Sequence, residues 1–172
     1  MVARISVGKN LYGALAYNQN KVDEGGAKIL SAHLLRYPED GRFRPDESVR
    51  QFLEWMPNHY RTEKPVIHIS LNPHPDDVLT DGQLAEIGRE YMQRLGYGNQ
   101  PYLVFKHEDI GRHHIHIVSL RVDSEGRKVS DKFEYRRSKE ITELLEQKYG
   151  LHPAEGRKKG EEWQLKPVDV AK

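Results

Sequence analysis

The sequence contains no cysteine. This absence excludes disulfide bonds and all metal sites that are built from thiolates. Histidine, which occurs nine times, is then the only side chain that offers a soft metal ligand. Any transition-metal site in this chain therefore has to draw on its histidines.

Long apolar runs are also missing, and the first residues lack the basic and then apolar blocks of a signal peptide. We therefore expect a soluble, cytoplasmic protein without membrane insertion. A strong charge of one sign is absent too, because the formal net charge is only +1. A nucleic-acid partner cannot be argued from that total and requires basic residues gathered on one face.

A length of 172 residues is enough for one domain with a proper core. We expect this domain to span residues 1–151, where the last amphipathic helix ends. Residues 152–172 are rich in charge and contain two prolines, which is typical of an extended tail. We interpret them as the start of a further segment.

Two apolar alternations, in residues 2–7 and 65–71, predict strands. Helical spacing predicts helices that are N-capped by four polar positions, namely Asn10, Asp46, Thr80 (in a capping box with Gln83) and Ser138. Strands and helices alternate irregularly, and several consecutive strands look hairpin-linked, which indicates an α+β fold with an antiparallel sheet. We expect helices on one face of this sheet and polar, histidine-bearing positions on the other.

The stretch from His107 to Val118 reads HEDIGRHHIHIV. Because side chains two apart on a strand point the same way, His114 and His116 share one face. The apolar run PYLVF before His107 predicts a second strand, and the short polar segment EDIGR is typical of a hairpin connection. An antiparallel hairpin brings the three histidines together, and three imidazoles leave coordination positions open, as in catalytic metal sites.

Two more side chains are candidates for the same site. Asp109 stands close enough in sequence to orient a metal ligand. His68 shares a strand face with Val66 and Ser70, and that face can look toward the histidine hairpin. We expect His68 to support a ligand or contact a phosphate and not to bind the metal directly.

The helix after Asn10 carries Tyr12 and Tyr17, which lie five positions apart and project in different directions. One can belong to the core while the other is functional. A histidine-bound cation near a tyrosine suits phosphate chemistry, in which the cation draws charge from an oxygen while the phenol attacks phosphorus. Since the unperturbed pKa of tyrosine is about 10, a cation or carboxylate must favour loss of its proton.

The N-terminal strand, the helix with GALAYNQNK, the HEDIGRHHIHIV stretch and the RRSKEITELLEQKYGL helix together resemble the relaxase/mobilisation nuclease family, in its tyrosine-using branch. The resemblance covers residues 1–151 and implies an HUH-type nuclease fold. It implies one divalent cation, Mg²⁺ or Mn²⁺ in function with other transition ions possible, held by His107, His114 and His116. It also implies that Tyr17 becomes joined to the 5′ phosphate of a nicked strand.

This resemblance implies a site-specific DNA relaxase that nicks and rejoins single-stranded DNA at a transfer origin (oriT) during conjugative mobilisation of a plasmid or transposon. Accessory mobilisation proteins and a coupling protein are the further partners it implies. The chain departs from the common pattern at Ile110-Gly111-Arg112-His113, so a catalytic role for Asp109 is a hypothesis. Basic residues flank the hairpin, and we expect DNA contacts from Arg112, Arg121, Arg127, Lys128, Arg136 and Arg137.

Three alternatives compete with this interpretation. A histidine-triad nucleotide hydrolase requires a third alternate histidine at position 118, which is valine here. A non-catalytic DNA-binding module on the same fold would bind the backbone in a salt-dependent way without cleavage. A rolling-circle replication initiator-like endonuclease is the third.

Overall fold

The computed structural model describes residues 1–40, 42–108 and 113–154. Five strands and four helices follow one another as β1 (Val2–Gly8), α1 (Leu11–Asp23), β2 (Ala27–His33), α2 (Pro45–Leu53), β3 (Val66–Asn72), α3 (Asp81–Leu95), β4 (Tyr102–His107), β5 (His114–Leu120) and α4 (Glu134–Tyr149). The expected tail, residues 152–172, lies outside the described residues from 155 onward. Within the described part, no helix is both long and apolar enough to cross a bilayer.

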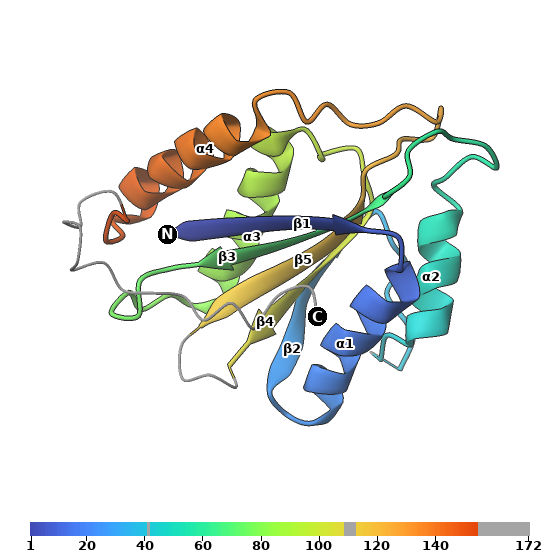
Figure 1. The fold of residues 1–172 in the computed structure, drawn as a ribbon. Helices are drawn as coiled ribbons and strands as arrows, with labels where there is room; N and C mark the ends of the chain where they lie inside the picture. The colour runs from blue at the N-terminus through green and yellow to red at the C-terminus, as the bar shows by residue number, and fades with distance from the viewer. Residues whose placement is uncertain (41, 109–112, 155–172) are drawn as a thin grey trace.

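The strands form one antiparallel sheet in the order β1-β3-β5-β4-β2. Figure 1 shows β3 and β5 in the middle of the sheet, between the N-terminal strand and the β4–β2 pair. The hairpin of β4 and β5 sets His107 directly opposite His114. The predicted α+β class and antiparallel sheet are thereby confirmed.

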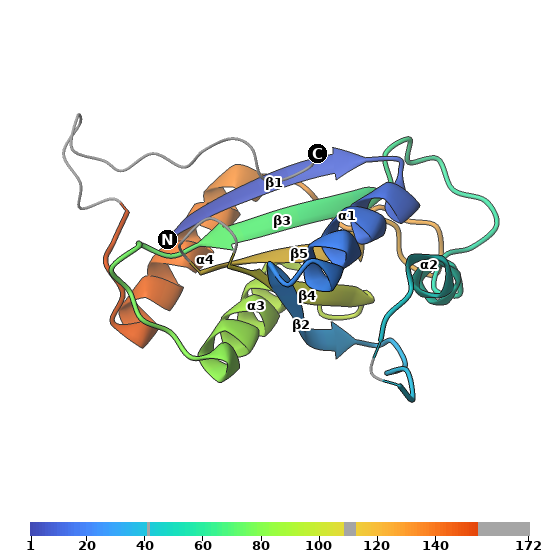
Figure 2. The same ribbon diagram turned by 90° about the horizontal axis from the view of Figure 1, so that it is seen from below.

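Both faces of the sheet are apolar in part, and each is covered by helices. Ile67, Ile69 and Leu71 of β3 pack with the inward residues of α3 and α4. On the opposite face, Leu11 and Leu15 of α1 form a second cluster that includes Val118, Phe105 and, from α2, Phe52. Figure 2 shows α3 and α4 on one side and α1 and α2 toward the other end of the sheet. Helices therefore lie on both faces, which corrects the expectation that they cover only the face opposite the histidines.

The physical reason is that the histidine-bearing face is only partly polar. Val66, Val118 and Leu120 lie on it beside His68 and are buried. Their apolar surface is removed from water by α1 and α2, at roughly 25 cal/mol for each Å². The sequence alternation identified the two faces correctly but gave no sign of this second helical layer.

Helix starts followed the predicted capping chemistry at two places out of four. Asn10 accepts a hydrogen bond from the backbone N–H of Gly13, and Thr80 forms the predicted capping box with Gln83. The predictions for Asp46 and Ser138 were wrong.

Proline at the first turn fixes the start of α2 at Pro45, so Arg44 is its N-cap and Asp46 lies inside the helix. Ser138 lies within α4, where its hydroxyl bonds the Tyr91 hydroxyl at 2.7 Å and joins α4 to α3.

Candidate metal centre

Three histidines converge at the end of the β4–β5 hairpin. His107, His114 and His116 each offer a ring nitrogen, these nitrogens lie within 4.8 Å of one another, and all three residues are buried. The cause is local, because strand pairing sets His107 opposite His114 and the two-residue period of β5 puts His116 on the same face. The close approach predicted from the sequence is present.

The ring of His116 has one nitrogen in a hydrogen bond and one without a partner. Its Nδ1 lies 3.0 Å from Nε2 of His68, while its Nε2 is buried and makes no hydrogen bond to any residue that the structure describes. Burial, with the neighbouring rings of His107, His68 and His114, holds the pKa of His116 well below its usual value. His116 is therefore neutral at pH 7, and in the tautomer protonated at Nδ1 its buried Nε2 carries a lone pair, which fits a metal ligand.

His68 lies on β3 beside this cluster, as its strand face predicted, and it is not one of the three grouped ligands. Burial lowers the pKa of His68 to about 4. If Nε2 of His116 held a cation, its Nδ1 would carry the ring proton and would donate to Nε2 of His68, which would then orient the His116 ring.

Tyr17 of α1 contacts this centre through its ring. Its ring is stacked on His107 with 6.2 Å between centroids and 21° between planes, and Nζ of Lys21 lies 5.9 Å from its centroid. Tyr12 lies one and a half turns earlier and is 54% exposed. Of the two tyrosines singled out in the sequence, Tyr17 is thus the one placed against a candidate ligand.

Asn18 is a residue of the site that the sequence interpretation did not assign. It is fully buried, and its Oδ1 lies 2.8 Å from Nε2 of His107. A signal was present, since Asn18 falls in line with Leu11 and Leu15 on the inward stripe of the helix. A polar side chain on such a stripe needs a partner inside the fold.

The structure does not place every predicted site residue beside the three histidines. Asp109 and Arg112 lie outside the described residues. The other basic candidates follow the far end of β5, which at about 3.3 Å per residue is roughly 20 Å from His114. Arg121 and Lys128 both pair with Asp131 at 3.1 Å.

The remaining three basic candidates also have local contacts. Arg127 pairs with Glu125, and Arg136 lies 5.0 Å above the ring of Phe133. Arg137 donates to backbone carbonyls, including that of Leu95. Each of these side chains therefore has a local partner, and a role in DNA binding stays a prediction.

A second group of potential ligands, His74, Asp76 and His152, lies at the surface. Nδ1 of His74 accepts the backbone N–H of Asp76 at 2.9 Å, and Nδ1 of His152 is 2.5 Å from the carboxylate of Asp77. The contact with Asp77 connects the segment after α4 to the loop after β3. These bonds account for the cluster without a metal.

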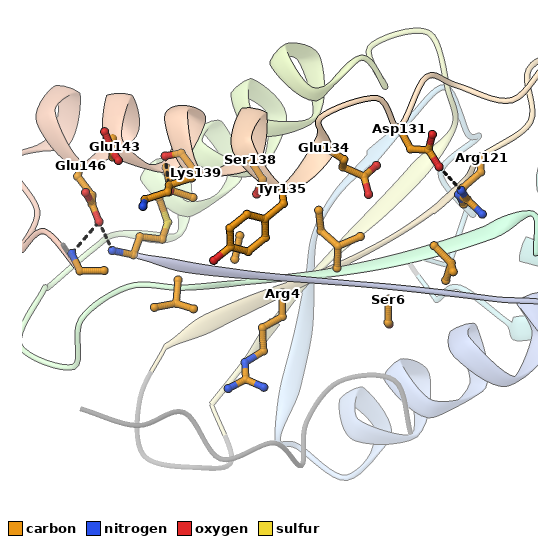
Figure 3. A pocket seen from close by; sticks show the side chains of 17 residues that line it. Arg4, Ser6, Arg121, Asp131, Glu134, Tyr135, Ser138, Lys139, Glu143 and Glu146 are labelled. Atoms are coloured by element: carbon orange, nitrogen blue, oxygen red, sulfur yellow. Dashed lines mark hydrogen bonds and ion pairs between the residues drawn. The ribbon is translucent and has the colours of Figure 1, made fainter. Parts of the chain in front are cut away.

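A groove of about 890 Å³ runs between β1 and α4. Figure 3 shows Tyr135 between these two elements and the ion pair of Arg121 with Asp131 at one end of the groove. Its lining mixes Arg4 and Lys139 with several acids and contains none of the three histidines. The groove is therefore separate from the histidine cluster.

The donor set of the cluster suits a catalytic cation. Three imidazole nitrogens fill part of a coordination sphere and leave positions open for oxygens of a substrate.

One family model matches this chain over most of its length. The family described as "Relaxase: MobA/VirD2-like, nuclease domain" matches residues 17–151. No curated protein matches the chain.

Proposed function

The chain belongs to the relaxase family, with a MobA/VirD2-like nuclease domain, and we propose that it nicks and rejoins one DNA strand at a transfer origin through a 5′-phosphotyrosyl intermediate. A relaxase nuclease domain is a metal-dependent domain that nicks DNA and binds it as a single strand. The finer parts of the proposal are the nucleophile, the ligands and the conjugative setting. The observation that carries it is Tyr17 stacked on a buried cluster of three histidines.

In this proposal, His107, His114 and His116 hold one divalent cation, Mg²⁺ or Mn²⁺. The unpartnered Nε2 of His116 and the depressed pKa of that ring support this assignment. When bound, the cation withdraws charge from a non-bridging oxygen of the scissile phosphate. The remaining chemistry belongs to the side chains.

Tyr17 is the proposed nucleophile. Its phenol oxygen forms a bond to phosphorus while the bond to the 3′ oxygen of the upstream nucleotide breaks. The phenolic proton passes to a base, and the departing oxygen gains a proton to become a free 3′ hydroxyl. Because one phosphodiester is exchanged for another, the step is reversible and needs no nucleotide triphosphate.

A base for the phenolic proton is needed because tyrosine is a poor nucleophile at neutral pH. We assign this role, or that of orienting a ligand, to Asp109 on its place between His107 and His114 in the sequence. The single strand is expected to run over basic and aromatic side chains. Arg112, Arg121, Arg127, Lys128, Arg136 and Arg137 stay the proposed contacts, and Arg136 with Phe133 offers a cationic and aromatic surface.

The setting that we propose is conjugative transfer of a plasmid or transposon from the cytoplasm. Accessory mobilisation proteins at the origin and a coupling protein are the proposed partners. A transfer origin is where a nicking and rejoining enzyme of this kind acts, and this context rests on the family alone.

A denaturing gel tests the mechanism. The labelled probe is a single-stranded oligonucleotide that spans the transfer origin of the element encoding the chain, incubated with Mn²⁺. Wild type and Tyr12→Phe should form a covalent adduct, and Tyr17→Phe should form none while its affinity for Mn²⁺ and for the oligonucleotide is nearly unchanged. His116→Ala should lose metal binding and cleavage together.

The gel also separates the alternatives. An adduct that persists in Tyr17→Phe and vanishes in Tyr12→Phe would identify Tyr12 as the nucleophile. Salt-dependent binding with no adduct in any lane favours the non-catalytic DNA-binding module. An adduct on a replication origin and none on the transfer origin favours the rolling-circle initiator.

A further inference from the structure

Asn18 is a buried amide whose two ends contact different partners. Its Nδ2 lies 2.8 Å from the backbone carbonyl of Ala14, and its Oδ1 lies 2.8 Å from Nε2 of His107. An amide removed from water is costly unless both of its ends are hydrogen-bonded. The position of Asn18 on the inward stripe of α1 is therefore tolerated because both contacts are made.

The carbonyl of Ala14 determines which way the amide points. A carbonyl oxygen accepts hydrogen bonds only, so the NH₂ group of Asn18 has to face it. The amide oxygen is then directed at His107. Since that oxygen also accepts only, Nε2 of His107 has to carry the ring proton.

A neutral imidazole has one proton, so Nδ1 of His107 holds the lone pair. Metal ligands are unprotonated nitrogens, and Nδ1 is accordingly the nitrogen that His107 offers. His116 differs, because its Nδ1 is bonded to His68 and its Nε2 has no partner. The two histidines thus present different nitrogens to the cluster, and at His107 the neighbouring amide of Asn18 decides which one.

We infer that Asn18 is a positioning residue that selects Nδ1 of His107 as the metal-binding nitrogen and ties this ligand to the helix carrying Tyr17. Asn18 follows Tyr17 directly, and α1 is packed on the sheet through Leu11 and Leu15. One hydrogen bond thus fixes the His107 ring and also holds the nucleophile's helix beside it. The inference rests on the proposed metal site and nucleophile.

The test compares two substitutions at Asn18. Asn18→Leu removes both contacts of the amide, whereas Asn18→Asp loses the donor toward Ala14 but keeps an oxygen that can accept from Nε2 of His107. Removal of a partner that orients a metal ligand typically weakens metal binding by about 10- to 100-fold. Calorimetry with Mn²⁺ alone should show that loss in Asn18→Leu, with Asn18→Asp within about threefold of wild type.

Gln19→Leu is the matched control. Gln19 is also a buried polar residue of α1, but its side chain bonds Asp23 and contacts no histidine through a hydrogen bond found in the described residues. Its replacement should leave Mn²⁺ affinity unchanged. A loss equal to that of Asn18→Leu would mean that α1 responds to any lost polar contact, and the inference would fail.

A second readout needs neither metal nor DNA. Nitrogen-15 NMR of the histidine-labelled, metal-free chain at neutral pH should show His107 protonated at Nε2 and unprotonated at Nδ1, and Asn18→Leu should lose this preference. A wild-type His107 protonated at Nδ1 would overturn the inference, as would unchanged Mn²⁺ affinity in Asn18→Leu. Because no cleavage is measured, a chain that passes both tests and forms no DNA adduct refutes the proposed function alone.

Discussion

Mild acid should destabilise the metal-free protein through the buried histidines on the sheet face. Burial lowers the pKa of His68 from 6.5 to about 4, so the unfolded chain binds a proton more readily than the folded chain between these values. The contribution of neutral His68 to stability is present above pH 6.5 and is lost as the pH falls toward 4. His116 changes in the same direction, since its pKa is also lowered.

The size of the effect follows from these two pKa values. Between pH 7 and pH 5, His68 alone should remove about 2 kcal/mol from the free energy of unfolding. Stopping at pH 5 keeps most carboxylates out of the comparison, because their ordinary pKa values are near 4. For a domain with a total stability of about 5 to 15 kcal/mol, a loss of this size is readily measured.

Urea denaturation in the presence of a chelator measures it. Wild type and His68→Gln are unfolded at pH 7 and at pH 5. The fall in the free energy of unfolding between these two pH values should be smaller in the variant than in wild type, by at least about 2 kcal/mol. Glutamine does not titrate and retains an acceptor for the Nδ1–H of His116. His59→Gln makes the same replacement at an exposed histidine and is the matched control. An equal loss in wild type and His68→Gln would refute the reasoning.

Two further predictions concern metal binding and helix α3. Calorimetry should show tighter binding of Mn²⁺ than of Mg²⁺, because three neutral imidazoles favour transition ions, and the opposite order would contradict the ligand set. At 100 times its Kd, Mn²⁺ should raise the free energy of unfolding by about 2.7 kcal/mol, and His114→Ala should abolish this gain. Thr80→Ala removes the hydroxyl that accepts the backbone N–H of Gln83 in the capping box. It should lower the free energy of unfolding, measured by chemical denaturation, by about 1 kcal/mol. No measurable change in that experiment would show that the cap is replaced by water.

Local geometry explains why the histidine site was predictable from the sequence. The backbone of a strand repeats every two residues, so the spelling HIHIV already puts His114 and His116 on one face. Pairing of the two strands then brings His107 opposite His114, as the observed register confirms. The capping box at Thr80 is local in the same sense, since both of its bonds form within one helical turn.

The surroundings of the site depend on contacts between residues far apart in the chain. His68 and His116 are separated by 48 positions and meet because β3 pairs with β5 in one register. Asn18 and His107 are separated by 89 positions and meet because α1 packs on the histidine face. Sequence periodicity identified the apolar face of each helix and strand, but it did not specify which of these faces pack against each other.

The same distinction accounts for the predictions that the structure altered. Ser138 has the chemistry of an N-cap, yet its hydroxyl serves the contact between α3 and α4, which no local pattern reveals. Arg121 is near His116 in sequence and far from it in space, because an extended strand carries the chain away from the site. By itself, the sequence determined the cluster of three histidines, the strand faces and the fold class. Tertiary packing decided that helices lie on both faces and that Asn18 and Tyr17 stand beside His107, because burial of apolar surface from distant segments selects among arrangements that local patterns allow equally.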